Sequence, residues 1–147
     1  LENGTTYAGL PHKFEAGTPH ISGAIALGVA LQWLTGVGLK NVMEHETILS
    51  AQARHQLGKI DGMRFIGSAP LSSGAVSFIV EGVHPYDLGT LLDQQGIAVR
   101  TGHHCTQPIM DHFDIPGTVR ASFGAYNTLQ EVDALVQGVE RALKMLR

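Results

Sequence analysis

The chain has 147 residues, which suits one domain with part of another, and its 44% hydrophobic content is enough to bury a core. A formal net charge of −3 and scattered Lys and Arg residues argue against binding to a nucleic-acid backbone. No apolar run is long enough for a membrane span and no secretion signal opens the chain, so we expect a cytoplasmic protein without a membrane partner. The single cysteine excludes an internal disulfide and suits a reducing compartment.

The N-terminal part reads as a loop followed by an apolar helix. Residues 1–13 are rich in Gly, Thr and Pro, and the next segment predicts a helix start with Thr18 as N-cap and Pro19 at the first helical position. Residues 20–34 are small and apolar on nearly all sides, so this helix must be covered by other elements. Backbone N–H groups at Gly17 and Thr18 make a candidate phosphate contact, although any capped helix offers the same groups.

The remainder alternates between helical and strand patterns. Helices are predicted over residues 41–60 and 84–95, with a short one after Pro108, and a Thr-x-x-Glu capping box at Thr128 and Glu131 opens a last helix. Strands are predicted over residues 63–66, 75–80, 96–99 and 118–123, and a turn over residues 70–73. This order predicts an α/β fold, a two-layer sandwich of helices on a small mixed or antiparallel sheet.

The loop that holds the only cysteine is the first candidate site. Cys105 follows His103 and His104 and lies five positions after Arg100. A thiol attacks as the thiolate, which nearby cationic groups favour, so the segment is a candidate for sulfur chemistry. The alternative is a buried, unreactive cysteine.

Arg120 is the second candidate because it lies inside a predicted strand, where a buried arginine is unfavourable unless it is paired. Its planar guanidinium matches a substrate carboxylate. A salt bridge to Asp111 or Asp114, or a strand face open to water, would explain the same residue without a substrate.

A metal site is not expected here. His103, His104 and Cys105 are consecutive, and neighbouring residues on an extended chain point to opposite sides, so all three cannot easily face one ion.

Four segments occur in an order that resembles a known family. They read Phe-Glu-Ala-Gly-Thr-Pro over residues 14–19, Arg-Thr-Gly-His-His-Cys over 100–105, Val-Arg-Ala-Ser over 119–122 and Tyr-Asn-Thr over 126–128. With them the chain resembles the C-terminal third of pyridoxal-phosphate-dependent cysteine desulfurases of the class V aminotransferase family. The short cysteine loop is similar to that of the group II, SufS-like branch, which includes selenocysteine lyases and serves iron–sulfur cluster assembly.

The resemblance implies a role for each motif residue. Cys105 would take sulfur from L-cysteine or selenium from selenocysteine, become a persulfide in the sulfur case, release alanine and pass sulfur to an acceptor protein. Arg120 would bind the substrate carboxylate, with Arg100 and His104 shaping the loop and its charge.

The cofactor contacts are implied in the same way. Thr18, with Gly17, would reach the pyridoxal 5′-phosphate of the opposite subunit in a homodimer.

One departure from the family concerns the cofactor lysine. The four lysines of this chain, Lys13, Lys40, Lys59 and Lys144, do not stand in the Ser-x-His-Lys-like context of the family's Schiff-base lysine. We therefore expect residues 1–36 to be the tail of a large cofactor-binding domain that the chain lacks, and residues 37–147 to be the small C-terminal domain with the cysteine loop. The chain alone should bind no cofactor covalently, show no turnover and self-associate through its apolar helix. A stand-alone persulfide carrier and a non-catalytic dimerisation module are the alternatives.

Overall fold

The computed structural model describes residues 4–67, 69 and 74–147, and it divides into two compact units, Leu1–Leu39 and Lys40–Arg147. The turn predicted over residues 70–73 lies outside the described residues.

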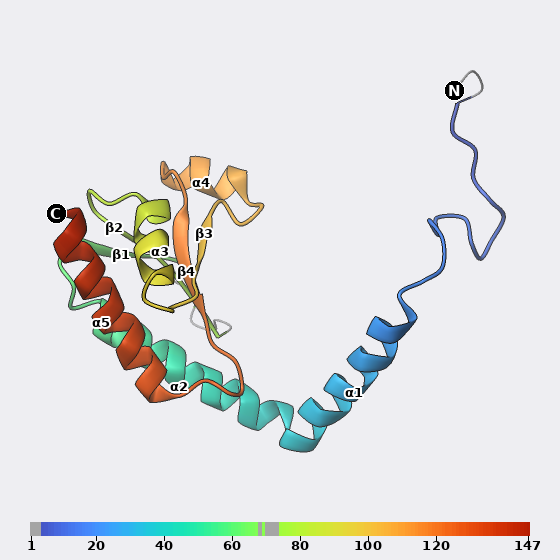
Figure 1. Ribbon diagram of the computed structural model, residues 1–147, viewed down its shortest axis with the longest axis horizontal. Coiled ribbons are helices and arrows are strands. Elements are labelled where there is room, and N and C mark those ends of the chain that lie inside the picture. Colours follow the sequence, from blue (N-terminus) through green and yellow to red (C-terminus); the bar gives the residue numbers. More distant parts are fainter. Residues whose placement is uncertain (1–3, 68, 70–73) are drawn as a thin grey trace. The chain divides into compact units, whose positions relative to one another are not determined.

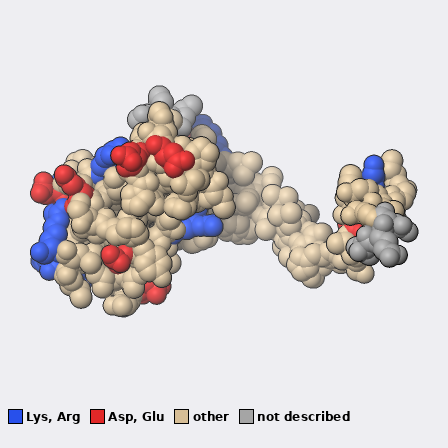
Figure 2. All heavy atoms as spheres, turned by 90° about the horizontal axis from the view of Figure 1, so that it is seen from above, with Lys and Arg blue, Asp and Glu red and all other residues tan. Residues whose placement is uncertain are grey.

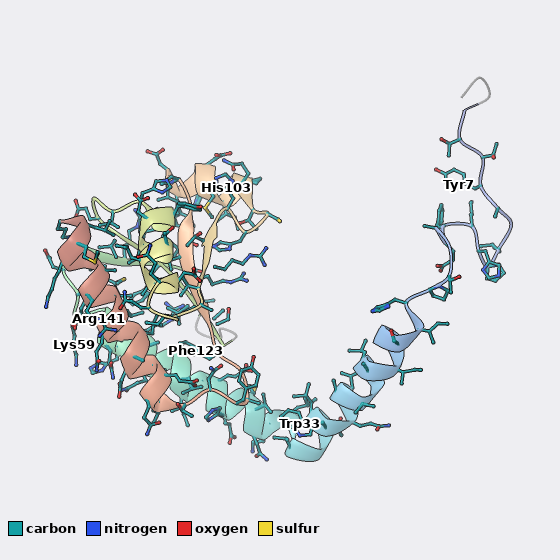
Figure 3. All side chains as sticks on the ribbon, viewed as in Figure 1. Tyr7, Trp33, Lys59, His103, Phe123 and Arg141 are labelled. Carbon is teal, nitrogen blue, oxygen red and sulfur yellow. The ribbon has the colours of Figure 1, made fainter. Side chains whose placement is uncertain are left out.

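The first unit holds one regular element, helix α1 over Ile21–Val37. The helix carries no Asp, Glu, Lys or Arg, which leaves it without red or blue spheres in Figure 2. None of its residues is buried within the described part of the chain; Ile25 is 66% exposed and Trp33, labelled in Figure 3, is 57% exposed. A helix that is apolar on every side and covered by nothing in its own unit presents a surface suited to burial against another molecule or segment.

The start of α1 corrects the predicted cap. The N-cap is His20, not Thr18, and Ala24 N–H donates the first intrahelical hydrogen bond to the His20 carbonyl at 3.0 Å. Pro19 precedes the helix; its carbonyl accepts from Ile21 N–H in a tight local turn (2.8 Å), and the His20 ring lies over the first turn beside Gly23. The backbone N–H groups of Gly17 and Thr18 therefore do not belong to a helix N-terminus.

The second unit has helices on an antiparallel sheet, as predicted (Figure 1). Its helices are α2 (Leu39–Leu57, which begins at the unit boundary), α3 (Pro85–Asp93), α4 (Gln107–Phe113) and α5 (Leu129–Leu146). Its strands are β1 (Met63–Ile66), β2 (Ala75–Val80), β3 (Arg100–Gly102) and β4 (Thr118–Ser122), in the order β1-β2-β4-β3. β1 and β2 have the predicted bounds, and α2 and α3 end three and two residues before the predicted bounds.

One face of the sheet builds the core. Along β2, Val76, Phe78 and Val80 are buried while the residues between them are half-buried, so the strand has one apolar and one mixed face. The buried side chains pack with those of α2, α3 and α5, among them Leu49, Leu57, Leu92, Val132 and Val139. The opposite face carries Ser77 and Arg120 as direct cross-strand neighbours.

The third strand starts four residues after its predicted start, at Arg100 rather than residue 96. Residues 97–99 are not in a strand, although Ile97 and Val99 pack against the core. Pairing with β4 begins only at Arg100 and ends at Gly102, opposite Thr118. Apolar character here reflects burial of side chains rather than pairing of the backbone, and the two need not coincide.

The predicted capping box of α5 is confirmed. Thr128 N–H donates to Glu131 Oε2 at 2.7 Å, and Glu131 N–H donates to Thr128 Oγ1 at 3.3 Å. The bond from the Thr128 backbone, with a second from Asn127, holds the pKa of Glu131 below its ordinary value. The helix whose start this box fixes supplies much of the core.

Replacing Thr128 by Ala should lower the free energy of unfolding of the second unit by about 1 kcal/mol, since an N-cap side chain that satisfies a free N–H is lost. Thr128→Ser keeps the hydroxyl and should lose less than half of that. Urea unfolding followed by circular dichroism measures both, and an Ala variant as stable as the parent would contradict the role of the cap.

The exposed surface of α1 should make the chain self-associate. Ile25→Lys with Val29→Lys, one turn apart on the helix, should shift sedimentation velocity profiles toward the monomer because two charges interrupt the apolar surface. The matched control adds the same two charges on exposed α5 positions, Gln130→Lys with Gln137→Lys, and should leave association unchanged. A parent chain that stays monomeric at all concentrations would contradict this expectation.

Candidate active site

The mixed face of the sheet and helix α4 enclose a groove of about 340 Å³. Figure 1 shows α4 beside the end of the sheet where β3 stops and β4 starts. The lining combines apolar residues of α4 and β1 with polar residues of the sheet and the cysteine loop: Ile66, Gly67, Ser77, His104, Thr106, Ile109, Met110, Phe113, Thr118 and Arg120. A concave surface with a few converging polar groups is the usual form of a small-molecule site.

Cys105 stands in a tight turn between β3 and α4. Both His104 and Cys105 have left-handed backbone, with φ of 53° and 60°, which is unfavourable for residues other than Gly. The turn is closed by Thr106, whose N–H and hydroxyl both donate to the His103 carbonyl, at 2.9 and 2.6 Å. Cys105 is exposed among the described residues, so the burial that the alternative required is not found. It is not among the lining residues, but the residues before and after it are.

His104 turns its ring into the groove. Nε2 lies 2.9 Å from Thr118 Oγ1, while Nδ1 is buried and has no hydrogen-bond partner among the described residues. Burial lowers the pKa of His104, the positive charge of Arg120 lowers it further, and the contact with Thr118 acts in the opposite direction. Weaker contributions from Arg100 and His103 also lower it, so the neutral imidazole is favoured near pH 7.

Arg120 and Arg100 are direct partners across the β3–β4 pair. Like charges opposite one another destabilise a sheet, and no acidic side chain forms a salt bridge with either within the described part of the chain. The expected alternative, a bond to Asp111 or Asp114, is absent there: Asp111 accepts from Gln107 and Asp114 ends α4. Arg120 Nε is buried without a partner among the described residues. An anion in the groove would satisfy this nitrogen and offset the repulsion.

The second unit thus brings together four of the six predicted site residues. Cys105, His104, Arg100 and Arg120 lie around or beside one groove. Gly17 and Thr18 belong to the first unit, are exposed and lie outside α1.

Sequence reasoning missed Thr118 and Ser77. Thr118 precedes Arg120 by two residues, and this period of two places both on one face of β4. Ser77 is the partner of Arg120 across β2 and β4. The alternation of side chains along β4 could have indicated Thr118. The position of Ser77 depends on the register between β2 and β4, which no local sequence pattern shows.

The lysines give no cofactor site among the described residues. Lys13 lies over the Phe14 ring, Lys40 pairs with Glu44, and Lys59 and Lys144 are exposed; none lines the groove. With Gly17 and Thr18 outside a helix N-terminus, the residues described here do not by themselves fit pyridoxal phosphate.

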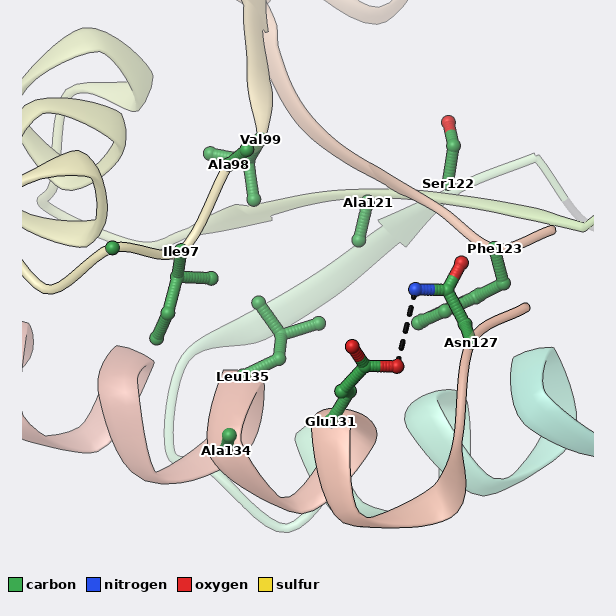
Figure 4. A pocket seen from close by; sticks show the side chains of 11 residues that line it. Ile97, Ala98, Val99, Ala121, Ser122, Phe123, Asn127, Glu131, Ala134 and Leu135 are labelled. Atoms are coloured by element: carbon green, nitrogen blue, oxygen red, sulfur yellow. Dashed lines mark hydrogen bonds between the residues drawn. The ribbon is translucent and has the colours of Figure 1, made fainter.

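A second cavity, shown in Figure 4, lies between α5 and residues 96–99, which lead into β3. Two of its polar side chains already have partners: Asn127 Oδ1 accepts from Gly124 N–H, and Asn127 Nδ2 donates to Glu131 at 3.2 Å. These bonds belong to the cap of α5, so we assign the cavity a structural origin.

Neither a metal site nor a single membrane-spanning helix is found among the described residues. No three His, Cys, Asp or Glu side chains converge there as metal ligands would. No single described helix is long and apolar enough to cross a membrane. Only α1 and α2 taken together, as a bent pair, have the length and composition of a membrane span.

Comparisons with known proteins agree with the motifs. The family model for class V aminotransferases matches residues 1–135. A probable cysteine desulfurase of Vibrio cholerae is 49% identical over 144 residues, which are 98% of this chain and 35% of that protein. A cysteine desulfurase of Escherichia coli is 43% identical over 146 residues, 99% of this chain and 36% of its own.

Two solved structures share the fold. The cysteine desulfurase CsdA of Escherichia coli, in an S-sulfonic acid form, matches with a TM-score of 0.84 and 41% identity over 93% of this chain and 34% of that one. The apo cysteine desulfurase of Thermococcus onnurineus matches with a TM-score of 0.83 and 39% identity, covering 92% and 34%. This chain therefore spans about a third of the length of its relatives. Together with the motifs and the groove, these matches lead to one conclusion: the chain belongs to the class V aminotransferase family.

Proposed function

We propose that this chain is the sulfur-accepting part of a cysteine desulfurase. The observation that carries the proposal is the exposed thiol of Cys105, held in a left-handed turn beside a groove that contains an arginine nitrogen without a partner among the described residues. Relatives named as cysteine desulfurases, 49% and 43% identical over nearly the whole chain, support it.

In this proposal Arg120 binds the carboxylate of L-cysteine. Its Nε is already desolvated, so a carboxylate gains a charge-assisted hydrogen bond without a further desolvation penalty at that atom. Arg100, directly across the strand pair, adds positive charge on the same face. Neutral His104 beside them adds a polar contact without adding to the repulsion.

The chemical step transfers one sulfur atom. The thiolate of Cys105 attacks the sulfur of the bound L-cysteine, and an S–S bond forms as the substrate's Cβ–S bond breaks. The electron pair of the broken bond stays with the carbon fragment, which takes up a proton and leaves as alanine. Cys105 is left as a persulfide, and its exposure allows an acceptor protein to reach it.

The family depends on pyridoxal phosphate, which when bound supplies the electron sink for the bond cleavage. Because the described residues do not hold it by themselves, we assign it to a further part of a longer protein. Residues 1–36 would then be the tail of that part and residues 37–147 the small domain, within a cytoplasmic homodimer in which Gly17 and Thr18 reach the cofactor phosphate of the other subunit.

A stand-alone persulfide carrier is the second candidate. The exposed thiol and the absence of a cofactor site among the described residues favour it. A carrier would receive sulfur from a partner and would not need Arg120 as a carboxylate ligand, so the arginine separates the two functions.

In the complete protein of which we propose this chain to be a part, Arg120→Lys should raise KM for L-cysteine about 10- to 100-fold, since a bond to a charged group contributes about 1.5–3 kcal/mol. Cys105→Ser should abolish persulfide formation. Arg64→Lys, an exposed arginine on the same sheet face outside the groove, is the matched control and should leave both unchanged. An unaltered KM in Arg120→Lys would contradict the carboxylate role of Arg120, whereas a protein that forms the Cys105 persulfide only with a sulfur-donating partner would favour the carrier.

The chain of 147 residues alone should bind no pyridoxal phosphate and release no alanine from L-cysteine. The physical reason is that its lysines lie outside the groove. The measurement is the visible absorbance of the protein after incubation with the cofactor and gel filtration, with alanine assayed in parallel. A retained coloured cofactor or steady alanine release would refute this expectation.

A further inference from the structure

Thr118 has a buried hydroxyl that the proposed chemistry does not use. It is the first residue of β4, is 1% exposed and lies opposite Gly102 of β3. A buried hydroxyl is unfavourable without a hydrogen bond, and the bond found for this one joins it to His104 Nε2 at 2.9 Å.

One partner of this contact, His104, lies in the strained part of the loop. His104 has φ of 53°, and the next residue, Cys105, has φ of 60°. Conformations of this kind persist only when the surroundings hold them. On one side of the turn Thr106 bonds twice to the His103 carbonyl, and on the other the His104 ring is fastened to β4 by Thr118.

The backbone keeps Thr118 within reach of the loop. A Cβ on Gly117 would lie 3.0 Å from the Cα of Gly102, so the strand ends approach each other more closely than a side chain would allow. Thr118 is thereby held next to Gly102, the last residue of β3, where the cysteine loop begins. A threonine can donate or accept, so it satisfies Nε2 in either tautomer of the ring.

We propose that Thr118 is a positioning residue: its hydroxyl holds the His104 ring in the groove and so stabilises the left-handed turn that presents Cys105. Its use in sulfur transfer rests on the proposed function, whereas the positioning itself does not. The groups that act on the His104 charge are Arg120 of β4, Arg100 of β3 and His103 of the loop, and removal of the Thr118 hydroxyl deletes none of them.

The test compares Thr118→Val, which keeps the branched shape and loses the hydroxyl, with Thr118→Ser, which keeps the hydroxyl. In the Val variant the amide of Thr106, whose N–H closes the turn, should exchange with solvent about fivefold faster because one neutral hydrogen bond is lost. Loss of the Thr118 contact alone would lower the pKa of His104, but release of the ring into water removes the larger effect of burial, so the titration of His104, followed by NMR of its ring, should move up toward the ordinary value. A downward shift would mean that the ring stays in place without the hydroxyl and would contradict the proposal. The Ser variant should restore both readouts.

A second pair of variants keeps the test decisive if the Val variant alters the fold. The variant His104→Asn lacks the imidazole, and asparagine tolerates a left-handed backbone at this position. If Thr118 acts through His104, then adding Thr118→Val, or Thr118→Ala, to His104→Asn should change Thr106 exchange no further. Equal exchange rates and an unmoved His104 titration in the folded Val variant would overturn the proposal, as would additive effects in the double variant. Since neither readout requires turnover, a protein that proves not to be a desulfurase would leave this result intact.

Discussion

The pairing of β3 with β4 is the constraint on which the candidate site depends. It is short, only three residues in β3, yet it sets Arg100 opposite Arg120 and Gly102 opposite Thr118. A shift of β3 by one residue would turn Arg100 toward the core face, away from Arg120, since successive side chains point to opposite faces. The close approach of Gly102 and Gly117 at the end of this pair favours the observed register over its neighbours.

The two faces of the sheet divide stability from chemistry. The face packed by α2, α3 and α5 is apolar and fully buried around Phe78, and it supplies the free energy that holds the fold. The other face holds two arginines without acidic partners among the described residues, and next to it lie two residues of strained backbone. Such features lower stability, and a protein retains them where a ligand or reaction uses them. The asymmetry is a physical argument for function that does not depend on any relative.

What the sequence could predict follows from the range of the interactions involved. The bounds of β1 and β2 and the cap of α5 depend on residues a few positions apart, and a local pattern records them. The position of β3 depends on its partner strand, so the apolar run over residues 96–99 was misleading. Thr18 was expected as a cap because Pro often begins a helix, but the His20 ring over Gly23 gives a later start. The bond between His104 and Thr118 joins residues 14 positions apart, which no periodicity reports. Arg120 was identified by its residue type, but its lack of an acidic partner could be seen only in three dimensions.

The separation of the chain into two units bears on how the proposed reaction would be divided between them. The thiol, the two arginines and the imidazole all lie in Lys40–Arg147, which has its own core, so this unit does not need the first one to form the groove. Helix α1, by contrast, buries nothing within the described residues and gains little from folding alone. Its stability must then come from burial against something outside its own unit, and a surface of this composition favours apolar association. In the proposed function, sulfur acceptance would reside in this self-contained unit, while assembly and cofactor binding would depend on residues 1–39 and whatever covers them.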